Sequence, residues 1–130
     1  MKTTLRRVAA SPMVRWILVA AWAGVIFAGS SVPGSDIPGG YSVYGHLAEY
    51  FVLGGLAAFA VGGPKRTAIG VALLLCAAYA ASDEIHQAFV PMRMPDPLDW
   101  LTDMLGAAAG AASLTLSAAK RAVRTGPDRQ

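Results

Sequence analysis

Apolar residues are gathered into four long runs along the chain. The runs cover Val14–Ser31, His46–Gly63, Thr67–Ala81 and Trp100–Ala119. Each approaches the ~20 residues that a helix needs to cross a bilayer about 30 Å thick. Because open sheets and loops cannot satisfy their backbone groups in lipid, we expect helices. The pattern predicts one all-α domain over residues 1–130, a four-helix transmembrane bundle with helices at about 14–31, 44–63, 67–88 and 98–119.

Basic residues flank these runs rather than forming a patch. They lie before the first run, between the second and third at Lys65 and Arg66, and after the fourth. By the positive-inside rule both termini and the short middle loop are predicted to be cytoplasmic. The formal net charge is +3 and the sequence pI is about 9.4. We expect these charges to meet the anionic headgroups of membrane lipids rather than nucleic acid.

The beginning of the chain also fits a cleaved secretory signal. It has a basic start, an apolar stretch and Ala28-Gly29-Ser30 as a candidate cleavage site. Cleavage would leave three helices without inverting the others. The single cysteine, Cys76, lies within an apolar run, which excludes a disulfide inside the chain and predicts that it packs as a small apolar residue.

Ionisable and amide side chains interrupt the apolar runs. Such groups cost roughly 2.5–3.5 kcal/mol each at mid-membrane and usually mark function. Counting ~20 residues inward from the basic end of each helix places them at one depth, just below the outer surface. The set is His46, Glu49, Asp83, Glu84, His86, Gln87, Asp99 and Asp103.

Helical spacing predicts the direction of these side chains. His46 and Glu49 share a face of the second helix with Tyr50, while Glu84 points about 100° away from Asp83 on the third. Three further predictions concern shared faces and the interface. On the third helix, one face carries Asp83, His86 and Gln87. On the fourth helix, one stripe carries Asp99, Asp103, Gly106 and Gly110. The aromatic belt at the outer membrane surface is expected to hold Tyr41, Tyr44, Tyr50 and Trp100. The small residues of the stripe allow a neighbouring backbone to approach closely.

Two loops join the helices on the outer side. Val32–Tyr41 is rich in glycine, proline and serine and is expected to be irregular, with Asp36 solvated. In the other loop, Asp96 before Pro97 is typical of a helix N-cap followed by N1. Arg93 also lies in this second loop.

The residue types leave three kinds of chemistry open. His46, Glu49, Asp83 and His86 are candidate ligands of a divalent metal, and the residue types identify no cofactor beyond this. Burial among carboxylates also suits a proton relay or acid–base pair. The third interpretation is a polar network that locks the helices together, with Arg93 satisfying one carboxylate. The chain has no serine–histidine–acid order, phosphate loop or paired-cysteine motif.

Three stretches together resemble the VanZ-like family of small bacterial membrane proteins, over about residues 16–119. Ile26–Pro33 is similar to the family's Phe-x-x-Ser-Ser-x-Pro end of helix one, and His46–Gly54 to its His-Phe-x-x-Tyr-x-x-Leu-Gly stretch. The most specific match is to Ser-x-Glu-x-x-Gln-x-Phe-x-Pro-Gly-Arg, then Asp-x-x-x-Asn/Asp-x-x-Gly. Its matching positions run through Ser82–Pro91, Arg93, Asp99, Asp103, Gly106 and Gly110.

The chain departs from the family pattern at three places. Met92 stands where glycine is usual, Asp103 where asparagine is common, and Ser42-Val43 where many members carry Asp-Lys. The resemblance implies a multi-pass protein of the bacterial cytoplasmic (inner) membrane. It also implies a link to teicoplanin-type glycopeptide resistance, known for the founding member. The family has no settled biochemical activity, so whether this chain is an enzyme stays open.

Three functions therefore compete. The first is a cell-envelope factor that lowers glycopeptide binding, with Glu84, Gln87 and Arg93 at its site and His46, Glu49, Asp99 and Asp103 in support. The second is a membrane enzyme acting on a lipid-linked or phosphorylated cell-wall precursor. The third is a non-catalytic subunit bound to a membrane protein partner through the small-residue stripe.

Overall fold

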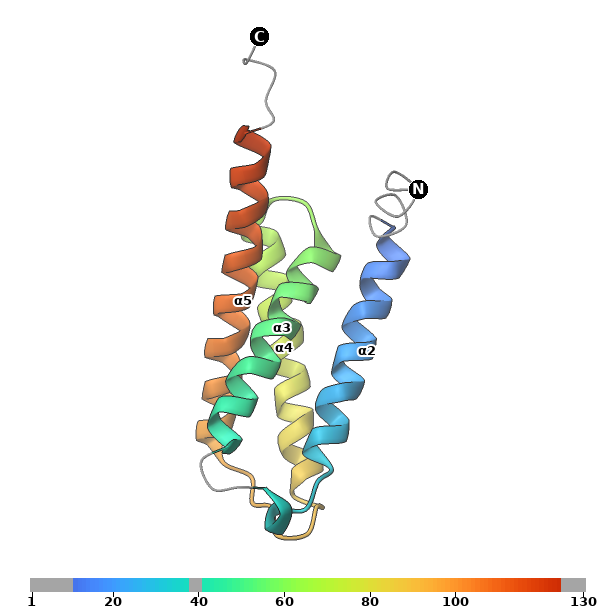
Figure 1. Ribbon diagram of the computed structural model, residues 1–130, viewed down its shortest axis with the longest axis vertical. Helices are drawn as coiled ribbons and strands as arrows, with labels where there is room; N and C mark the ends of the chain where they lie inside the picture. The colour runs from blue at the N-terminus through green and yellow to red at the C-terminus, as the bar shows by residue number, and fades with distance from the viewer. Residues whose placement is uncertain (1–10, 38–40, 125–130) are drawn as a thin grey trace.

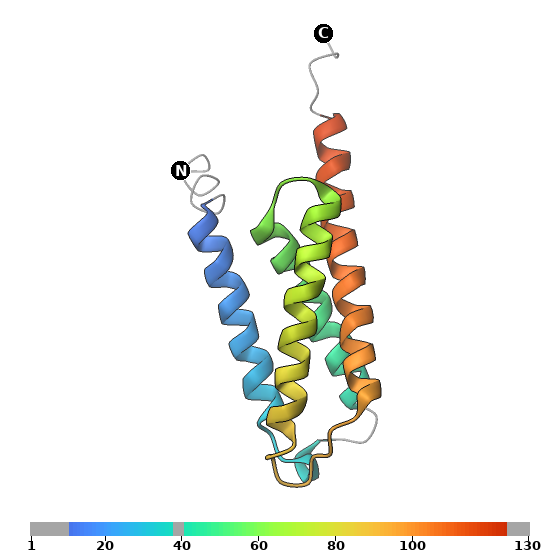
Figure 2. The same cartoon turned by 180° about the vertical axis from the view of Figure 1, so that it is seen from behind.

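Four antiparallel helices make up the described part of the chain. The computed structural model describes residues 11–37 and 41–124. The helices are α2 (Pro12–Ser30), α3 (Tyr41–Val61), α4 (Lys65–Gln87) and α5 (Pro97–Arg124), with the short 3-10 helix η1 (Gly34–Asp36) between α2 and α3. The α3–α4 turn lies at one end of the bundle, together with the start of α2 and the end of α5 (Figures 1 and 2). The other two connections lie at the opposite end. The all-α, four-helix prediction is confirmed.

Proline and glycine set the helix boundaries. Pro12 and Pro97 are the first residues of α2 and α5, and Pro64 precedes α4. α3 ends at Val61 because Gly62 and Gly63 adopt positive φ values of 63° and 72°. α2 begins at Pro12, two residues earlier than predicted.

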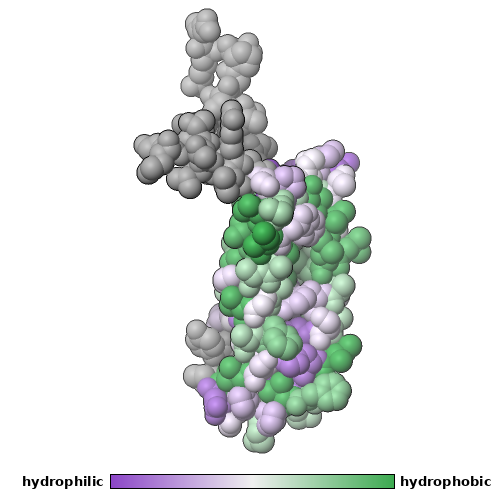
Figure 3. All heavy atoms as spheres, turned by 90° about the vertical axis from the view of Figure 1, so that its right-hand side faces the viewer, coloured by the Kyte–Doolittle hydropathy of each residue, from purple (hydrophilic) through white to green (hydrophobic). Residues whose placement is uncertain are grey.

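The membrane prediction is met by three of the four helices. Pro12–Ser30, Val43–Val61 and Lys65–Gln87 are long and apolar enough to cross a bilayer. Exposed apolar side chains such as Ile17 and Leu74 face outward, as lipid contact requires. Figure 3 shows one face, where hydrophobic residues cover much of the surface and hydrophilic ones gather in its lower half. A fourth crossing by α5, which carries Asp99 and Asp103, and the cytoplasmic placement of both termini remain predictions.

Glycines bring α3 and α5 into backbone contact. A Cβ at Gly54 would overlap the carbonyl of Ala107, and one at Gly110 would overlap the carbonyl of Phe51. A Cβ at Gly106 would come within 2.5 Å of the Leu47 carbonyl oxygen. The predicted small-residue stripe therefore packs within this chain, against α3.

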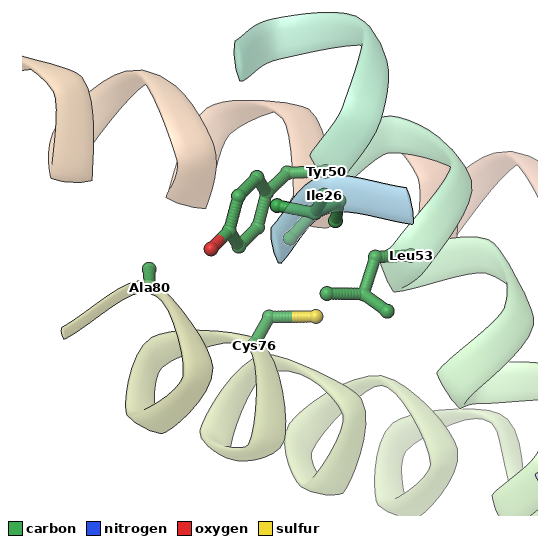
Figure 4. Close-up of a cluster of buried hydrophobic side chains, with 6 residues drawn as sticks. Ile26, Tyr50, Leu53, Cys76 and Ala80 are labelled. Carbon is green, nitrogen blue, oxygen red and sulfur yellow. The ribbon is translucent and has the colours of Figure 1, made fainter. Parts of the chain in front are cut away.

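The apolar core takes residues from all four helices, with Ala107 as the contribution of α5 (Figure 4). Its largest members are Ile26, Tyr50, Leu53 and Cys76, all buried. Cys76 packs as a small apolar residue, as predicted. The placement of Tyr50 in the aromatic belt is wrong, because its face of α3 turns inward and its side chain is fully buried. The belt prediction for Tyr41 lies outside the described side chains.

Candidate functional site

Three polar side chains join the last turn of α2 to the last turns of α4. The Ser30 hydroxyl donates to Asp83 Oδ2 at 2.7 Å, and Gln87 Nε2 donates to the same oxygen at 3.0 Å. All three side chains are buried. Asp83 and Gln87 share a face of α4, as their spacing predicts, and α2 supplies their partner. The serine was not among the predicted site residues.

Arg93 lies in the loop after α4 and is hydrogen-bonded to this group through Gln87. Its Nη1 donates to Gln87 Oε1 at 3.2 Å, its Nη2 to the Gly29 carbonyl at 3.3 Å and its Nε to the Val32 carbonyl at 3.3 Å. Among the residues that the structure describes, Arg93 makes no ion pair with a carboxylate. The interpretation that Arg93 satisfies a carboxylate is therefore wrong. The carbonyls of Gly29 and Val32, at the end of α2, and the Gln87 side-chain amide take its donors instead.

A tight turn places Arg93 next to the end of α2. Met92 has a φ of 60°, a conformation that glycine adopts at less cost, and glycine is usual here in the resembling family. The Gly34 amide donates to the Pro91 carbonyl at 3.1 Å. A Cβ at Gly34 would overlap the Met92 carbonyl, so the two outer loops are in backbone contact.

A second buried group joins α3 to α5. His46 Nδ1 lies 2.9 Å from Asp103 Oδ1, and His46 Nε2 lies 3.9 Å from Asp99 Oδ2. His46 is 5% exposed and Asp103 is fully buried. The imidazole therefore has a carboxylate at each nitrogen, with the shorter contact deeper in the bundle.

Glu84 lies on the side of α4 that faces the start of α5. Its Oε2 accepts the Asp96 amide at 3.0 Å, and it interacts electrostatically with Asp99 and His46. Asp96 Oδ1 in turn accepts the Leu98 amide at 2.9 Å, which confirms the predicted N-cap of α5. Glu84 therefore points away from Asp83, as predicted, and belongs with the histidine group.

Glu49 lies between the two groups. A Cβ at Gly29 would come within 3.4 Å of Glu49 Oε1, so this carboxylate packs against the end of α2. The Glu49 backbone carbonyl accepts the indole N–H of Trp22 at 2.8 Å. Its electrostatic neighbours include His46, Asp83 and Arg93, which places it near both groups.

His86 lies apart from the other histidine. Its Nε2 is 3.0 Å from the Ser31 hydroxyl, and its ring stacks on Phe27 at 4.4 Å between centroids. Phe27 lies on α2 and Ser31 directly follows it, whereas His46 pairs with α5. Within residues 11–37 and 41–124, no three histidine, cysteine or acidic side chains are arranged to hold a metal ion. The four predicted ligands (His46, Glu49, Asp83 and His86) therefore do not form one site.

Three carboxylates in this region each have one oxygen in a hydrogen bond and the other oxygen without one. Asp83 Oδ1, Glu84 Oε1 and Asp103 Oδ2 are buried and have no hydrogen-bond partner among the described residues. These atoms could accept hydrogen bonds or hold protons. We call the region that carries these groups the polar end. Its members are Ser30, His46, Glu49, Asp83, Glu84, Gln87, Arg93, Asp99 and Asp103.

Sequence reasoning did not include the α2 residues in the site. Ser30 and the Gly29 carbonyl bond to Asp83 and Arg93, but neither is ionisable and both precede a loop. The signal that could have found them is the serine pair Ser30-Ser31 at the end of an apolar helix. Polar side chains at a helix end need partners when that end is buried.

Comparison with known proteins gives one match. A family model described as VanZ/LLP1 matches residues 14–118. No curated protein and no solved structure matches the chain significantly. The matched residues include every member of the polar end.

Proposed function

Because the chain belongs to the VanZ-like family, we propose that it acts in the bacterial cell envelope and lowers sensitivity to teicoplanin-type glycopeptides. Three membrane-compatible helices support a position in the cytoplasmic membrane. The link to glycopeptides comes from the family resemblance. The polar end is the region of the chain on which we base the site.

The observation that carries this proposal is the joining of all four helices at one end by buried polar contacts. Asp83 is bonded to α2, and His46 is bonded to α5. Burying such groups is costly unless they are paired, and apolar residues of similar volume would hold the helices together at less cost. Three buried carboxylate oxygens without partners add to this cost. The presence of so many costly buried polar groups at one end of the bundle supports a functional role.

The charge of the polar end favours one kind of ligand chemistry. Carboxylates outnumber its single arginine, and Arg93 directs three donors at its own chain. Like charges repel, so phosphate groups are disfavoured there. Hydroxyl, amide and ammonium groups, as found on glycans and stem peptides, fit the acceptors better.

Glycopeptide susceptibility tests the proposal directly. Teicoplanin inhibition is measured in a sensitive bacterium with and without the chain, together with binding of labelled teicoplanin to the cell surface. We expect a higher inhibitory concentration and less surface binding when the chain is present. Unchanged inhibition and unchanged binding would refute the resistance function.

A membrane enzyme is the second candidate, and the His46–Asp103 contact favours it. A carboxylate bonded to one imidazole nitrogen fixes the tautomer and orients the ring, which is how acid–base histidines are held in enzymes. The test is incubation of the reconstituted chain with a lipid-linked cell-wall precursor, followed by mass spectrometry. A mass change that is lost in His46→Gln supports catalysis, and an unaltered precursor argues against it.

The third candidate function is a subunit that binds a partner protein through the small-residue stripe. The stripe no longer supports it, because the stripe is occupied within this chain. Gly106 and Gly110 contact α3 of the same chain. A partner protein would have to bind another surface.

A further inference from the structure

Large apolar side chains are exposed at the same end of the bundle as the polar end, in and beside the loop that joins α4 to α5 (lower end of Figure 1). They are between 66% and 86% exposed. We call these five side chains the apolar rim: Ile85, Phe89, Met92, Met94 and Leu98. Exposed apolar groups gathered in one region mark places where a protein meets a membrane or another protein.

The charged side chains of this loop bind the protein itself. Arg93 is partly buried and directs its three donors at its own chain. Asp96 Oδ1 accepts the Leu98 amide at 2.9 Å. A loop in water usually has the opposite arrangement, with polar side chains in the solvent and apolar ones inside. The loop is therefore better suited to apolar surroundings.

The loop backbone is also suited to surroundings with little water. Three of residues 88–98 are proline, which has no N–H group. Other backbone amides donate to acceptors within the chain at 2.9 to 3.2 Å, namely those of Ala88, Phe89, Val90, Arg93, Asp96 and Leu98. Most N–H groups of the loop therefore need no water, which is the condition for placing backbone in lipid.

The apolar rim continues exposed apolar faces of two helices. Leu74 and Ile85 lie three turns apart on one exposed face of α4, a helix long and apolar enough to cross a bilayer. On α5, Leu98, Leu101 and Leu105 recur at helical spacing and are all exposed. Lipid that covers these faces therefore reaches the rim. This continuity favours lipid over a partner protein as the occupant.

We propose that the apolar rim is immersed in the lipid leaflet at this end of the bundle, at the level of the headgroups and the first part of the acyl chains. Residues 85–98 contain no lysine, and their exposed side chains are mainly apolar. Because Arg93 binds Gln87, immersion of the loop also places the polar end below the lipid surface. The proposal does not depend on any effect on glycopeptides.

The test uses spin labels in the full chain. Cys76→Ala removes the natural thiol, and Phe89→Cys, Met92→Cys and Met94→Cys then introduce one labelling site at a time. Each nitroxide-labelled chain is reconstituted in phosphatidylcholine vesicles. Electron paramagnetic resonance measures collisions of the label with oxygen, which concentrates in lipid, and with a water-soluble nickel chelate. We expect collisions with oxygen to exceed those with nickel at all three positions.

Two matched positions calibrate the measurement. Leu74→Cys places the label on the exposed apolar face of α4, where collisions with oxygen should dominate. Asp36→Cys places it on an exposed polar residue of the other loop at the same end, where collisions with nickel should dominate. All of these side chains are exposed, so burial in the protein does not distinguish them. Circular dichroism checks that each labelled chain keeps its helices.

Two results would overturn the proposal. Labels on the apolar rim that collide mostly with nickel, as at Asp36, would mean that the loop lies in water. Labels that collide with neither reagent would mean that a second copy of the chain, rather than lipid, covers the rim.

Discussion

His46 and Asp103 are joined 2.9 Å apart, from Nδ1 to Oδ1, across the interface of α3 and α5. This contact depends on how closely the two helices approach. Gly106 lies three residues after Asp103 and touches the Leu47 carbonyl, next to His46. The glycines of α5 thus set the separation at which the imidazole and the carboxylate meet.

The first prediction concerns the partner of His46. Asp103→Asn keeps an oxygen in place to accept from Nδ1, whereas Asp103→Ala leaves a buried ring nitrogen without a partner. The alanine variant should lose about 1–3 kcal/mol of unfolding free energy and the asparagine variant much less. Thermal unfolding in detergent measures both. Equal stability of the two variants would show that the hydrogen bond contributes nothing.

The second prediction tests the close approach of α3 and α5. Gly110→Ala places a methyl group against the Phe51 carbonyl and should cost about 1–3 kcal/mol or more, because the backbones must separate. Gly24→Ala is the matched control, since no atom lies within 4 Å of its added carbon. Chemical unfolding of both variants is the measurement. Similar midpoints for the two would contradict the packing described for this interface.

The third prediction concerns the turn before Arg93. Met92 is 80% exposed and has a positive φ, so its backbone rather than its side chain determines the cost. Met92→Gly should change the unfolding free energy by less than about 0.5 kcal/mol, because relief of strain offsets the added chain entropy. Met92→Val should lower it by about 1–2 kcal/mol, since β-branching disfavours this conformation. A valine variant as stable as the glycine variant would argue against a left-handed turn.

The fourth prediction concerns the three hydrogen bonds that the Arg93 guanidinium donates. Its three donors reach Gln87, Gly29 and Val32 in different directions, which a lysine ammonium cannot reproduce. Arg93→Lys should therefore loosen the α4–α5 loop nearly as much as Arg93→Gln. Limited proteolysis of this loop would reveal the change as faster cleavage in both variants. Slow cleavage in the lysine variant alone would mean that charge, not geometry, is what matters.

The sequence was sufficient for the four helices and for the gathering of the polar groups at one end of the bundle. Asp96 with Pro97 marks a helix start by local chemistry alone. Contacts within one helix, such as Asp83 with Gln87, follow from spacing. These features depend only on residues near one another in the chain.

Contacts between helices could not be predicted in the same way. Spacing placed His86 beside Asp83, but it does not say which helix packs against that face, and α2 rather than α3 does so. The rotation that buries Tyr50 is likewise set by its neighbours. Arg93 could not be assigned, because the carbonyls that it bonds become available only where α2 ends.

Teicoplanin susceptibility of charge-matched variants tests the central claim, that the polar end is the functional site. Glu84→Gln removes a carboxylate from the polar end and keeps an acceptor for Asp96, while Asp36→Asn removes an exposed one from the outer loop. At equal abundance in the membrane, we predict that Glu84→Gln loses the protection that the unaltered chain gives and Asp36→Asn retains it. Full protection by Glu84→Gln, together with full protection by His46→Gln, would contradict the account.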